Sequence, residues 1–311
     1  MLNKNILITG GAGYIGSHLS NLLFKKKYNI FIIDDLSTGN KRRLNENIIF
    51  YKCCISNKKK ISNIIKKKNI THVIHLAGKI NALESQKNKK KYFDVNYKFS
   101  KIMYNVCVKH KIKKIIFAST AAVYGDYKTR FKENDQTKPI NNYGASKLKF
   151  EEYLKNKKKI DYSILRFFNV AGGYYIKNLK HDNKDSVILR LYKIFNSKKK
   201  EFFISVNKEN KSTRRDFIHI LDLINIIEKS IYNNKKNLVM NCGYGKSISI
   251  LRICNEFEKF YKVKIKKIIK LKKDSDPYEV IADISLLKKL FNYSAKYNSY
   301  KKIISKISHL N

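Results

Sequence analysis

Short apolar runs rich in isoleucine and valine alternate with longer amphipathic stretches through the first half of the chain. Alternation of a strand period with a helix period is typical of a parallel sheet covered by helices. Runs such as Ile115-Ile116-Phe117 are apolar at every position, which favours strands buried on both faces. We therefore predict an α/β fold with a doubly wound parallel sheet. Its predicted strands are Asn5–Thr9, Asn29–Asp34, Ile48–Tyr51, His72–Leu76, Lys114–Ser119 and Tyr162–Phe167.

The pattern changes near residue 170, where the predicted strands become shorter and polar insertions more frequent. Two amphipathic segments in this second part, Leu221–Tyr232 and Ile250–Tyr261, predict helices. We predict a first domain over residues 1–170 and a smaller α/β lobe that takes most of residues 171–311. Some segments of this lobe are expected to return to the first domain.

The formal net charge is +43, and 59 of the 67 basic residues are lysines. Proteins that read bases or clamp phosphates favour the arginine fork, which is scarce here. The lysines are spread over every segment, and the chain also has only 2 prolines and no tryptophan, a joint bias typical of A–T-rich codon usage. We therefore expect a solvated lysine surface and no specific nucleic-acid partner.

Three further features narrow the class of protein. No apolar run approaches the roughly 18 residues that span a membrane, and the first residues show no signal-peptide pattern. The five cysteines have no C-x-x-C spacing, so neither a zinc site nor a disulfide framework is indicated. His72 and His75, three apart on a predicted strand, face opposite sides and make a poor chelate. We expect a cytoplasmic protein with no membrane partner and no metal site.

A glycine-rich turn, Thr9-Gly10-Gly11-Ala12-Gly13-Tyr14-Ile15-Gly16, joins the first predicted strand to an amphipathic stretch. Glycines at such a turn let backbone N–H groups approach a pyrophosphate and let the helix pack close to the sheet. Asp34, at the end of the second predicted strand, lies 18 residues past Gly16, near the spacing of a carboxylate that binds a ribose 2′-hydroxyl. Because an acid there repels a 2′-phosphate, the sequence predicts NAD rather than NADP as the cofactor.

Tyr143 and Lys147 lie four residues apart at the start of a predicted helix and so share one face. A nearby ammonium favours the phenolate form of a tyrosine. A phenolate can take a proton from an alcohol while hydride leaves for a nicotinamide cofactor. Thr120 follows the strand Lys114–Ser119, at the edge where open α/β sheets bind ligands. The three residues together predict proton and hydride transfer at an alcohol.

These motifs resemble those of the extended short-chain dehydrogenase/reductases, and within that family those of the UDP-glucose 4-epimerases. The resemblance runs from about Asn5 to Leu290. Besides the segments above, it is carried by Asp34-Asp35-Leu36-Ser37-Thr38-Gly39, His75-Leu76-Ala77-Gly78, Glu84-Ser85, Ser119-Thr120-Ala121-Ala122-Val123-Tyr124-Gly125, Tyr143-Gly144-Ala145-Ser146-Lys147, Arg166-Phe167-Phe168-Asn169-Val170-Ala171-Gly172, Arg215-Asp216-Phe217-Ile218-His219 and Asp276-Pro277.

The resemblance implies a Rossmann-type NAD-binding domain followed by a sugar-nucleotide-binding lobe. It implies the 4-epimerisation of a UDP-hexose through a 4-keto intermediate, with bound NAD as the cofactor, a UDP-sugar as the substrate and a homodimer as the assembly. Val280, four residues after Asp276, borders the sugar 2-substituent in this alignment, and its small size predicts room for N-acetylated sugars.

The family roles carry over to matching positions of this chain. Tyr143 would be the base, Lys147 would support it and bind the nicotinamide ribose, and Thr120 would bridge tyrosine and sugar. The residues expected at the cofactor are Gly10, Gly13, Tyr14, Ile15, Gly16, Asp34, Asp35, Cys54, Ile55, Leu76, Ala77, Gly78, Asn96, Tyr143, Lys147 and Phe168. Those expected at the substrate are Thr120, Asn169, Arg215, Lys273, Asp276 and Val280.

The chain also departs from the family pattern at three positions. Cys54 stands where the family usually has an acid near the adenine. A lysine often found two residues after the Ala-Gly pair is Ile80 here, with Lys79 one position early. Lys273 replaces an arginine, a point charge in place of a fork. These changes bear on affinity more than on chemistry.

Three rival functions remain open at this point. A sugar-nucleotide 4,6-dehydratase also oxidises C4 but needs an acid and a base after the active-site threonine, where this chain has Ala121-Ala122. A non-catalytic NAD-binding regulator of the same fold should lack the tyrosine, the lysine or the threonine. A nucleic-acid-binding role would show as a steep salt dependence of oligonucleotide binding.

Overall fold

The computed structural model describes residues 4–173 and 186–305. A seven-stranded sheet forms its centre, and every neighbouring pair of strands in it is parallel. The predicted doubly wound α/β fold is confirmed, and each predicted strand lies within one residue of an observed one. In spatial order the strands are β11 (Leu238–Cys242), β7 (Asp161–Phe167), β5 (Lys114–Thr120), β4 (His72–His75), β1 (Asn5–Thr9), β2 (Asn29–Asp34) and β3 (Ile49–Lys52).

Helices cover both faces of this sheet because its strands are apolar on both sides. Along β1, Ile6 and Ile8 pack on the side of α1 (Tyr14–Lys25) and α8 (Ile220–Tyr232), whereas Leu7 faces the opposite core. That opposite face is covered by α2 (Lys58–Lys67), α5 (Ser100–Lys109) and α6 (Asn142–Lys157). The apolar stripe of α2 at Ile61, Ile64 and Ile65 is buried, as its helical spacing requires.

Short helical turns follow the carboxyl ends of the strands, next to the cavity described in the next subsection. They are α3 (Ala82–Lys87), α4 (Lys89–Phe93), two 3₁₀ turns at Lys41–Arg43 and Ala121–Val123, and a π-helical turn at Asp94–Phe99 that runs into α5. π-helical turns inside α-helices are frequent at functional sites.

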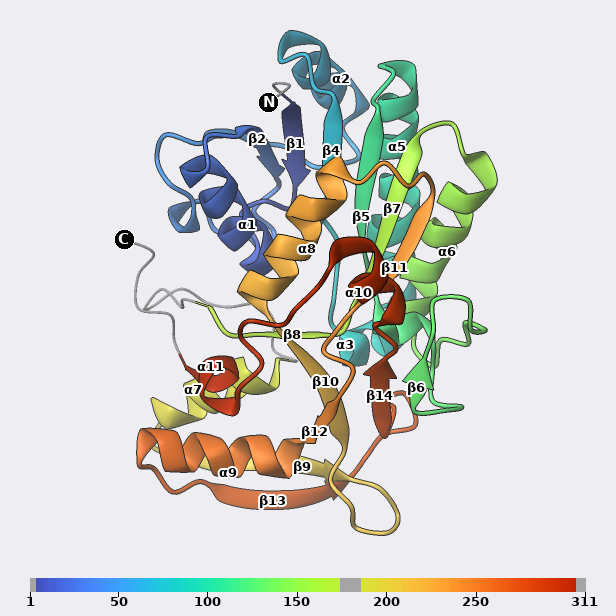
Figure 1. Cartoon of the computed structure of the whole chain (residues 1–311). Helices are drawn as coiled ribbons and strands as arrows, with labels where there is room; N and C mark the ends of the chain where they lie inside the picture. Colours follow the sequence, from blue (N-terminus) through green and yellow to red (C-terminus); the bar gives the residue numbers. More distant parts are fainter. Residues whose placement is uncertain (1–3, 174–185, 306–311) are drawn as a thin grey trace.

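A second, smaller lobe lies below the large sheet in the view of Figure 1. Its main sheet has the order β12 (Ser247–Ser249), β10 (Arg214–His219), β14 (Glu279–Ala282) and β6 (Arg130–Phe131), and β8 (Asn169–Ala171) also pairs with β10. A parallel pair of strands, β9 (Glu201–Val206) and β13 (Lys266–Leu271), lies beside it. The remaining helices are α7 (Val187–Phe195), α9 (Ile250–Tyr261), α10 (Ser285–Phe291) and α11 (Tyr300–Ile304).

The two sheets exchange segments along the chain. Strand β11 comes late in the sequence yet pairs with β7 in the large sheet, and β6 comes early yet pairs with β14 in the small one. The domain boundary at residue 170 therefore stays a prediction about binding roles. Within residues 4–173 and 186–305, no helix is long and apolar enough to cross a membrane.

Candidate active site

One cavity of about 590 Å³ lies at the carboxyl ends of β1, β2, β4, β5 and β7, where the small lobe faces the large sheet. Strand order reverses beside β1, and ligands of open α/β sheets bind at such a switch point. The cavity brings together most of the residues predicted for the site. They are Gly10, Gly13, Tyr14, Ile15, Gly16, Asp34, Asp35, Cys54, Ile55, Leu76, Ala77, Gly78, Thr120, Tyr143, Lys147, Phe168 and Asn169.

The glycine-rich turn forms one wall of the cavity, and its glycines are required by close backbone contacts. Gly10 has a φ of +69°, and a Cβ atom there would lie 2.7 Å from the backbone nitrogen of Ala77. A Cβ atom on Gly16 would lie 2.2 Å from the carbonyl oxygen of Gly10. Helix α1 begins within this segment, at Tyr14, and no side chain caps its first N–H groups. This end of the cavity therefore fits the pyrophosphate of a dinucleotide.

Asp34 ends β2 and is held by backbone N–H groups on both carboxylate oxygens. Its Oδ2 accepts a hydrogen bond from the Ala12 nitrogen at 3.0 Å, and its Oδ1 accepts one from the Leu36 nitrogen at 2.8 Å. Burial raises the pKa of Asp34, while the two N–H groups oppose this by favouring the carboxylate. A fixed carboxylate at this position fits the hydroxyl groups of an adenosine ribose and repels a 2′-phosphate.

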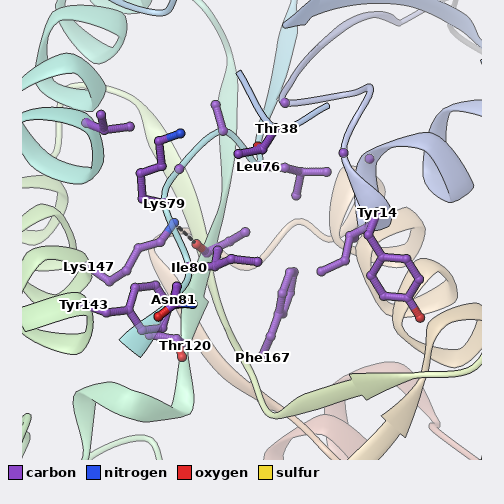
Figure 2. Close-up of a pocket in the computed structure, with 18 of the residues that line it drawn as sticks. Tyr14, Thr38, Leu76, Lys79, Ile80, Asn81, Thr120, Tyr143, Lys147 and Phe167 are labelled. Atoms are coloured by element: carbon purple, nitrogen blue, oxygen red, sulfur yellow. Dashed lines mark hydrogen bonds between the residues drawn. The ribbon is translucent and has the colours of Figure 1, made fainter. Parts of the chain in front are cut away.

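Tyr143 lies in the first turn of α6, whose start is fixed from two sides. The Asn141 side chain caps the helix by accepting from the Gly144 nitrogen at 2.8 Å. The Tyr143 nitrogen donates to the Ser85 hydroxyl of α3 at 3.0 Å. Figure 2 shows the Tyr143 ring at the same end of the cavity as Thr120, which ends β5.

Lys147 is one turn further along α6 and is only 3% exposed. Its ammonium donates to the carbonyl oxygen of Ala118 at 2.9 Å, the dashed line from Lys147 in Figure 2. The same ammonium lies 4.8 Å from the centre of the Phe117 ring. Burial lowers the pKa of Lys147 to about 8, because few groups replace the water that would solvate its charge. With a pKa of about 8, the lysine stays mainly cationic near neutral pH.

Asn96 does not line the cavity but is fully buried in the π-helical turn behind it. Its Oδ1 accepts from the Lys79 nitrogen at 2.8 Å, and its Nδ2 donates to the Lys79 carbonyl at 2.9 Å and to the Ser146 hydroxyl at 2.9 Å. Asn96 thus joins the loop after β4 to helix α6. Its role at the cofactor stays a prediction, and the structure shows that it shapes the loop.

The departures from the family pattern also have defined positions. Cys54 and Ile55 line the cavity beside Asp35. Lys79 lines it too, and its ammonium reaches across to the Ser37 hydroxyl at 3.2 Å. A cation is therefore present on this wall although the family position is occupied by Ile80, which also lines the cavity. The sequence pattern shows that Lys79 is displaced by one position, but not where its side chain lies.

The residues predicted for a sugar nucleotide in the small lobe lie outside the described cavity lining, apart from Asn169. Arg215 on β10 pairs with Asp276, with 2.5 Å between Nη2 and Oδ1, and its Nη1 donates to the Tyr278 carbonyl at 3.1 Å. Lys273 is exposed and lies in a turn. Its carbonyl oxygen accepts a hydrogen bond from the Asp276 nitrogen. Val280 on β14 is 5% exposed and belongs to an apolar cluster with Phe168 and Val123.

Sequence reasoning missed the side chains from other segments that hold helix α6 in place. Ser85 and Asn96 come from segments remote from α6 in the sequence, and their hydrogen bonds to α6 form only in the folded chain. Asn141 also donates from Nδ2 to the Ser275 carbonyl at 3.2 Å, which links the start of α6 to the Asp276 loop. The resemblance did include Ser85 and Asn96, but it assigned neither of them a contact with α6.

A glycine-rich turn, a strand-end carboxylate and a tyrosine–lysine pair around one cavity define a nicotinamide-dinucleotide-dependent enzyme with a Rossmann-type domain. The family model of the NAD dependent epimerase/dehydratase family matches residues 6–243. The chain therefore belongs to this family, which its motifs resemble.

Individual relatives agree with this assignment. The UDP-glucose 4-epimerase of Dictyostelium discoideum is 30% identical over 319 residues, covering 96% of this chain and 93% of the relative. The structure of UDP-glucose 4-epimerase from Brucella ovis in complex with NAD superposes with a TM-score of 0.88 at 26% identity, covering 97% and 96% of the two chains. The UDP-Glc/GlcNAc 4-epimerase from Campylobacter jejuni gives a TM-score of 0.83 at 28% identity and covers 97% of each chain.

Proposed function

We propose that this protein interconverts UDP-hexoses that differ in configuration at C4, using bound NAD, with UDP-glucose and UDP-galactose as substrates. The observation that carries the proposal is one cavity with a dinucleotide end at Gly10–Gly16 and Asp34 and a proton-transfer end at Tyr143, Lys147 and Thr120. Relatives named UDP-glucose 4-epimerase along almost the whole chain support this substrate class.

The chain's own side chains account for the proton transfers. When bound, NAD supplies the site that accepts a hydride from C4 of the sugar and later returns it. Tyr143 takes the proton of the 4-hydroxyl and gives it back, with Thr120 as the hydrogen-bonding neighbour of both groups. The Lys147 ammonium favours the phenolate form of Tyr143. The 4-keto sugar turns over between the two transfers, so no net oxidation occurs.

Arg215 is the proposed anchor of the diphosphate. A guanidinium suits this role because its planar fork matches phosphate oxygens. Asp276 already orients this guanidinium, so the arginine pays little conformational entropy on binding. An anchor remote from Tyr143 lets the sugar rotate while the nucleotide stays in place, as epimerisation requires.

We further propose that N-acetylated UDP-hexoses are accepted, because Val280 is small and lies beside Phe168 in the cluster behind the site. The C. jejuni relative, named for both UDP-Glc and GlcNAc, supports this extension. Val280→Tyr should lower kcat/KM for UDP-N-acetylglucosamine about fivefold more than for UDP-glucose. Equal kcat/KM ratios in the variant and the natural protein would show that Val280 is not the gate.

A homodimer and a cytoplasmic location are proposed on the family resemblance. The five cysteines are all unpaired, which supports a reducing compartment. Analytical ultracentrifugation should give a mass twice the 36.5 kDa of the chain. A species at the mass of one chain, at micromolar concentration, would contradict the dimer.

The activity itself is tested by incubating the purified protein with UDP-galactose and no added NAD. Formation of UDP-glucose is expected because the cofactor has no reason to leave during a cycle without net redox change. A product that lacks water across C5 and C6 would instead indicate a 4,6-dehydratase, although Ala121 and Ala122 carry no titratable group for that step.

A further inference from the structure

A buried ion pair lies directly behind the proton-transfer end of the cavity. Glu151 of α6 is 0% exposed and Arg166 of β7 is 1% exposed. Arg166 Nη2 lies 2.7 Å from Glu151 Oε2, and Arg166 Nε lies 3.1 Å from Oε1. Two desolvated charges seldom add net stability compared with apolar residues of similar volume. This arrangement therefore suggests a role other than stabilising the core.

The Glu151 carboxylate joins three elements of the site. On α6 it follows Lys147 by four residues and Tyr143 by eight, so the three side chains share one helix face. Its Oε1 also accepts a hydrogen bond from the Ser119 hydroxyl on β5. Ser119 is the residue before Thr120, and it pairs in register with Arg166 on β7.

The remaining nitrogen of the Arg166 guanidinium, Nη1, is also hydrogen-bonded. Its Nη1 donates to the Tyr124 hydroxyl at 2.9 Å and to the Glu133 carbonyl at 3.0 Å. The Tyr124 hydroxyl in turn donates to Asn241 Oδ1 at 2.6 Å. Tyr124 and Glu133 follow Thr120 along the chain, so the guanidinium fixes the segment that leaves the strand end as well as the strand itself.

We propose that Glu151 is a positioning residue of the active site, whose carboxylate sets the distance between the helix that carries Tyr143 and Lys147 and the strand end that carries Thr120. This inference rests on the proposed function. Proton transfer depends on heavy-atom distances near 3 Å, so a small shift of one element against the other slows the reaction.

Besides its role in positioning α6, the negative charge of Glu151 acts on the Lys147 ammonium. Among the described residues, Glu151 on α6 and His75 on β4 interact electrostatically with the Lys147 ammonium. Burial lowers the pKa of His75 to about 3, so this imidazole is neutral and contributes no charge near pH 7. Glu151 partly offsets the burial that lowers the pKa of Lys147.

The test replaces both members of the pair. Removing Glu151 alone would leave the Arg166 guanidinium buried without its counter-charge, and removing Arg166 alone would leave Glu151 with only the partly exposed Lys155 ammonium, 3.5 Å from its Oε2. In Glu151→Leu/Arg166→Met the core keeps its volume and loses both charges. We expect kcat for UDP-galactose to fall at least about tenfold, with unchanged KM, unchanged NAD content and cooperative unfolding. Ser119→Ala removes only the link to β5 and is expected to lower kcat about threefold to fivefold.

Glu152→Gln is the matched control. Glu152 is the neighbour on the same helix, is 46% exposed and pairs only loosely with Lys149 at 3.4 Å. Its substitution removes one carboxylate charge from α6 without touching Ser119 or Arg166, and kcat should stay within about twofold of the natural protein.

Two results would overturn the positioning role. One is a folded, NAD-containing double variant with kcat within twofold of the natural protein. The other, decisive if the double variant does not fold, is unchanged kcat in Ser119→Ala.

A natural protein that leaves UDP-galactose unchanged would refute the proposed function instead. Hydrogen exchange of residues 118–123 then decides the positioning role. Exchange should be faster in Ser119→Ala than in Glu152→Gln, and equal exchange would contradict the inference.

Discussion

The cofactor-binding and sugar-nucleotide-binding ends of the proposed site are built in different ways. The cofactor end at Gly10–Gly16 and Asp34 lies on one continuous stretch, β1, the glycine-rich turn, α1 and β2, and is shaped by close backbone contacts and backbone N–H groups. The proposed sugar-nucleotide end is assembled from β8, β10 and the turn before β14, and its proposed anchor, Arg215, already pairs with Asp276. A binding site that is shaped by backbone atoms tolerates few substitutions at its glycines. A binding site that is shaped by side chains can change its ligand preference through single amino-acid substitutions. The cofactor should therefore be the fixed part of this enzyme and the sugar the variable part.

Tyr143→Phe tests the point where the two ends meet, and it should have the largest effect. Loss of the general base predicts a fall in kcat of at least about a hundredfold. NAD content and KM should stay unchanged, since the glycine-rich turn, Asp34 and Arg215 all remain in place. Tyr153→Phe on the same helix, where the hydroxyl donates to Asn105, is the control and should retain full turnover. Near-natural turnover of Tyr143→Phe would move the chemistry elsewhere.

Gly10→Ala breaks the cofactor end alone. The φ of +69° and the 2.7 Å approach to the Ala77 nitrogen leave no room for a Cβ atom. The affinity for NAD should fall at least about tenfold, measured by isothermal titration of the cofactor-free protein. Gly13→Ala is the matched comparison, because a Cβ atom on Gly13 would lie 3.2 Å from the Gly10 carbonyl oxygen. The loss of NAD affinity in this variant should therefore be smaller. A reversed order of the two variants would contradict the backbone account.

Arg215→Lys breaks the sugar-nucleotide end alone. A lysine keeps the charge but loses the fork, so KM for UDP-galactose should rise about fivefold to tenfold, with kcat within twofold and NAD content unchanged. Arg214→Lys is the control, because that side chain pairs with Glu279 at 2.8 Å and is more exposed. An equal rise of KM in both variants would indicate a general weakening of β10 rather than a lost anchor.

Lys147→Met tests how the buried ammonium, which lies between the two ends, affects the free energy of unfolding. The folded-state pKa of about 8 lies below the ordinary 10.5, so the unfolded chain binds more protons between these values. The free energy of unfolding should therefore rise as the pH increases from about 8 to 10.5, and below pH 8 the full cost of the buried ammonium remains. The variant should lose this rise and be more stable at pH 7 by about 1–3 kcal/mol. Urea unfolding of the cofactor-free proteins at pH 7 and 9.5 measures the difference, and parallel pH dependences would contradict it.

The elements that follow from local sequence were predictable to the residue. Strands β1 and β2 and helix α9 begin and end where their apolar periods predict. The glycine turn and the Tyr143–Lys147 spacing are also local, because each lies within a few consecutive residues. The predicted cofactor residues, with the exception of Asn96, therefore meet in one cavity.

The contacts that fix these residues were not predictable, because they join segments remote in the sequence. Ser85 meets the Tyr143 nitrogen only once α3 packs on α6, and Ser119 meets Glu151 only once β5 lies beneath that helix. Strand β6 has two residues and no period of its own, so its pairing with β14 depends on the assembled small lobe. The burial of Val280 against Phe168 likewise appears only in the folded chain.

The fate of the hydrogen on C4 tests the central claim most directly. UDP-galactose that carries deuterium at C4 is incubated with the purified protein in ordinary water, and the UDP-glucose formed is examined by mass spectrometry and NMR. Because the hydride leaves C4 and returns within one closed site, the account predicts that the product keeps its deuterium at C4. Loss of deuterium to the solvent, or no conversion without added NAD, would contradict it.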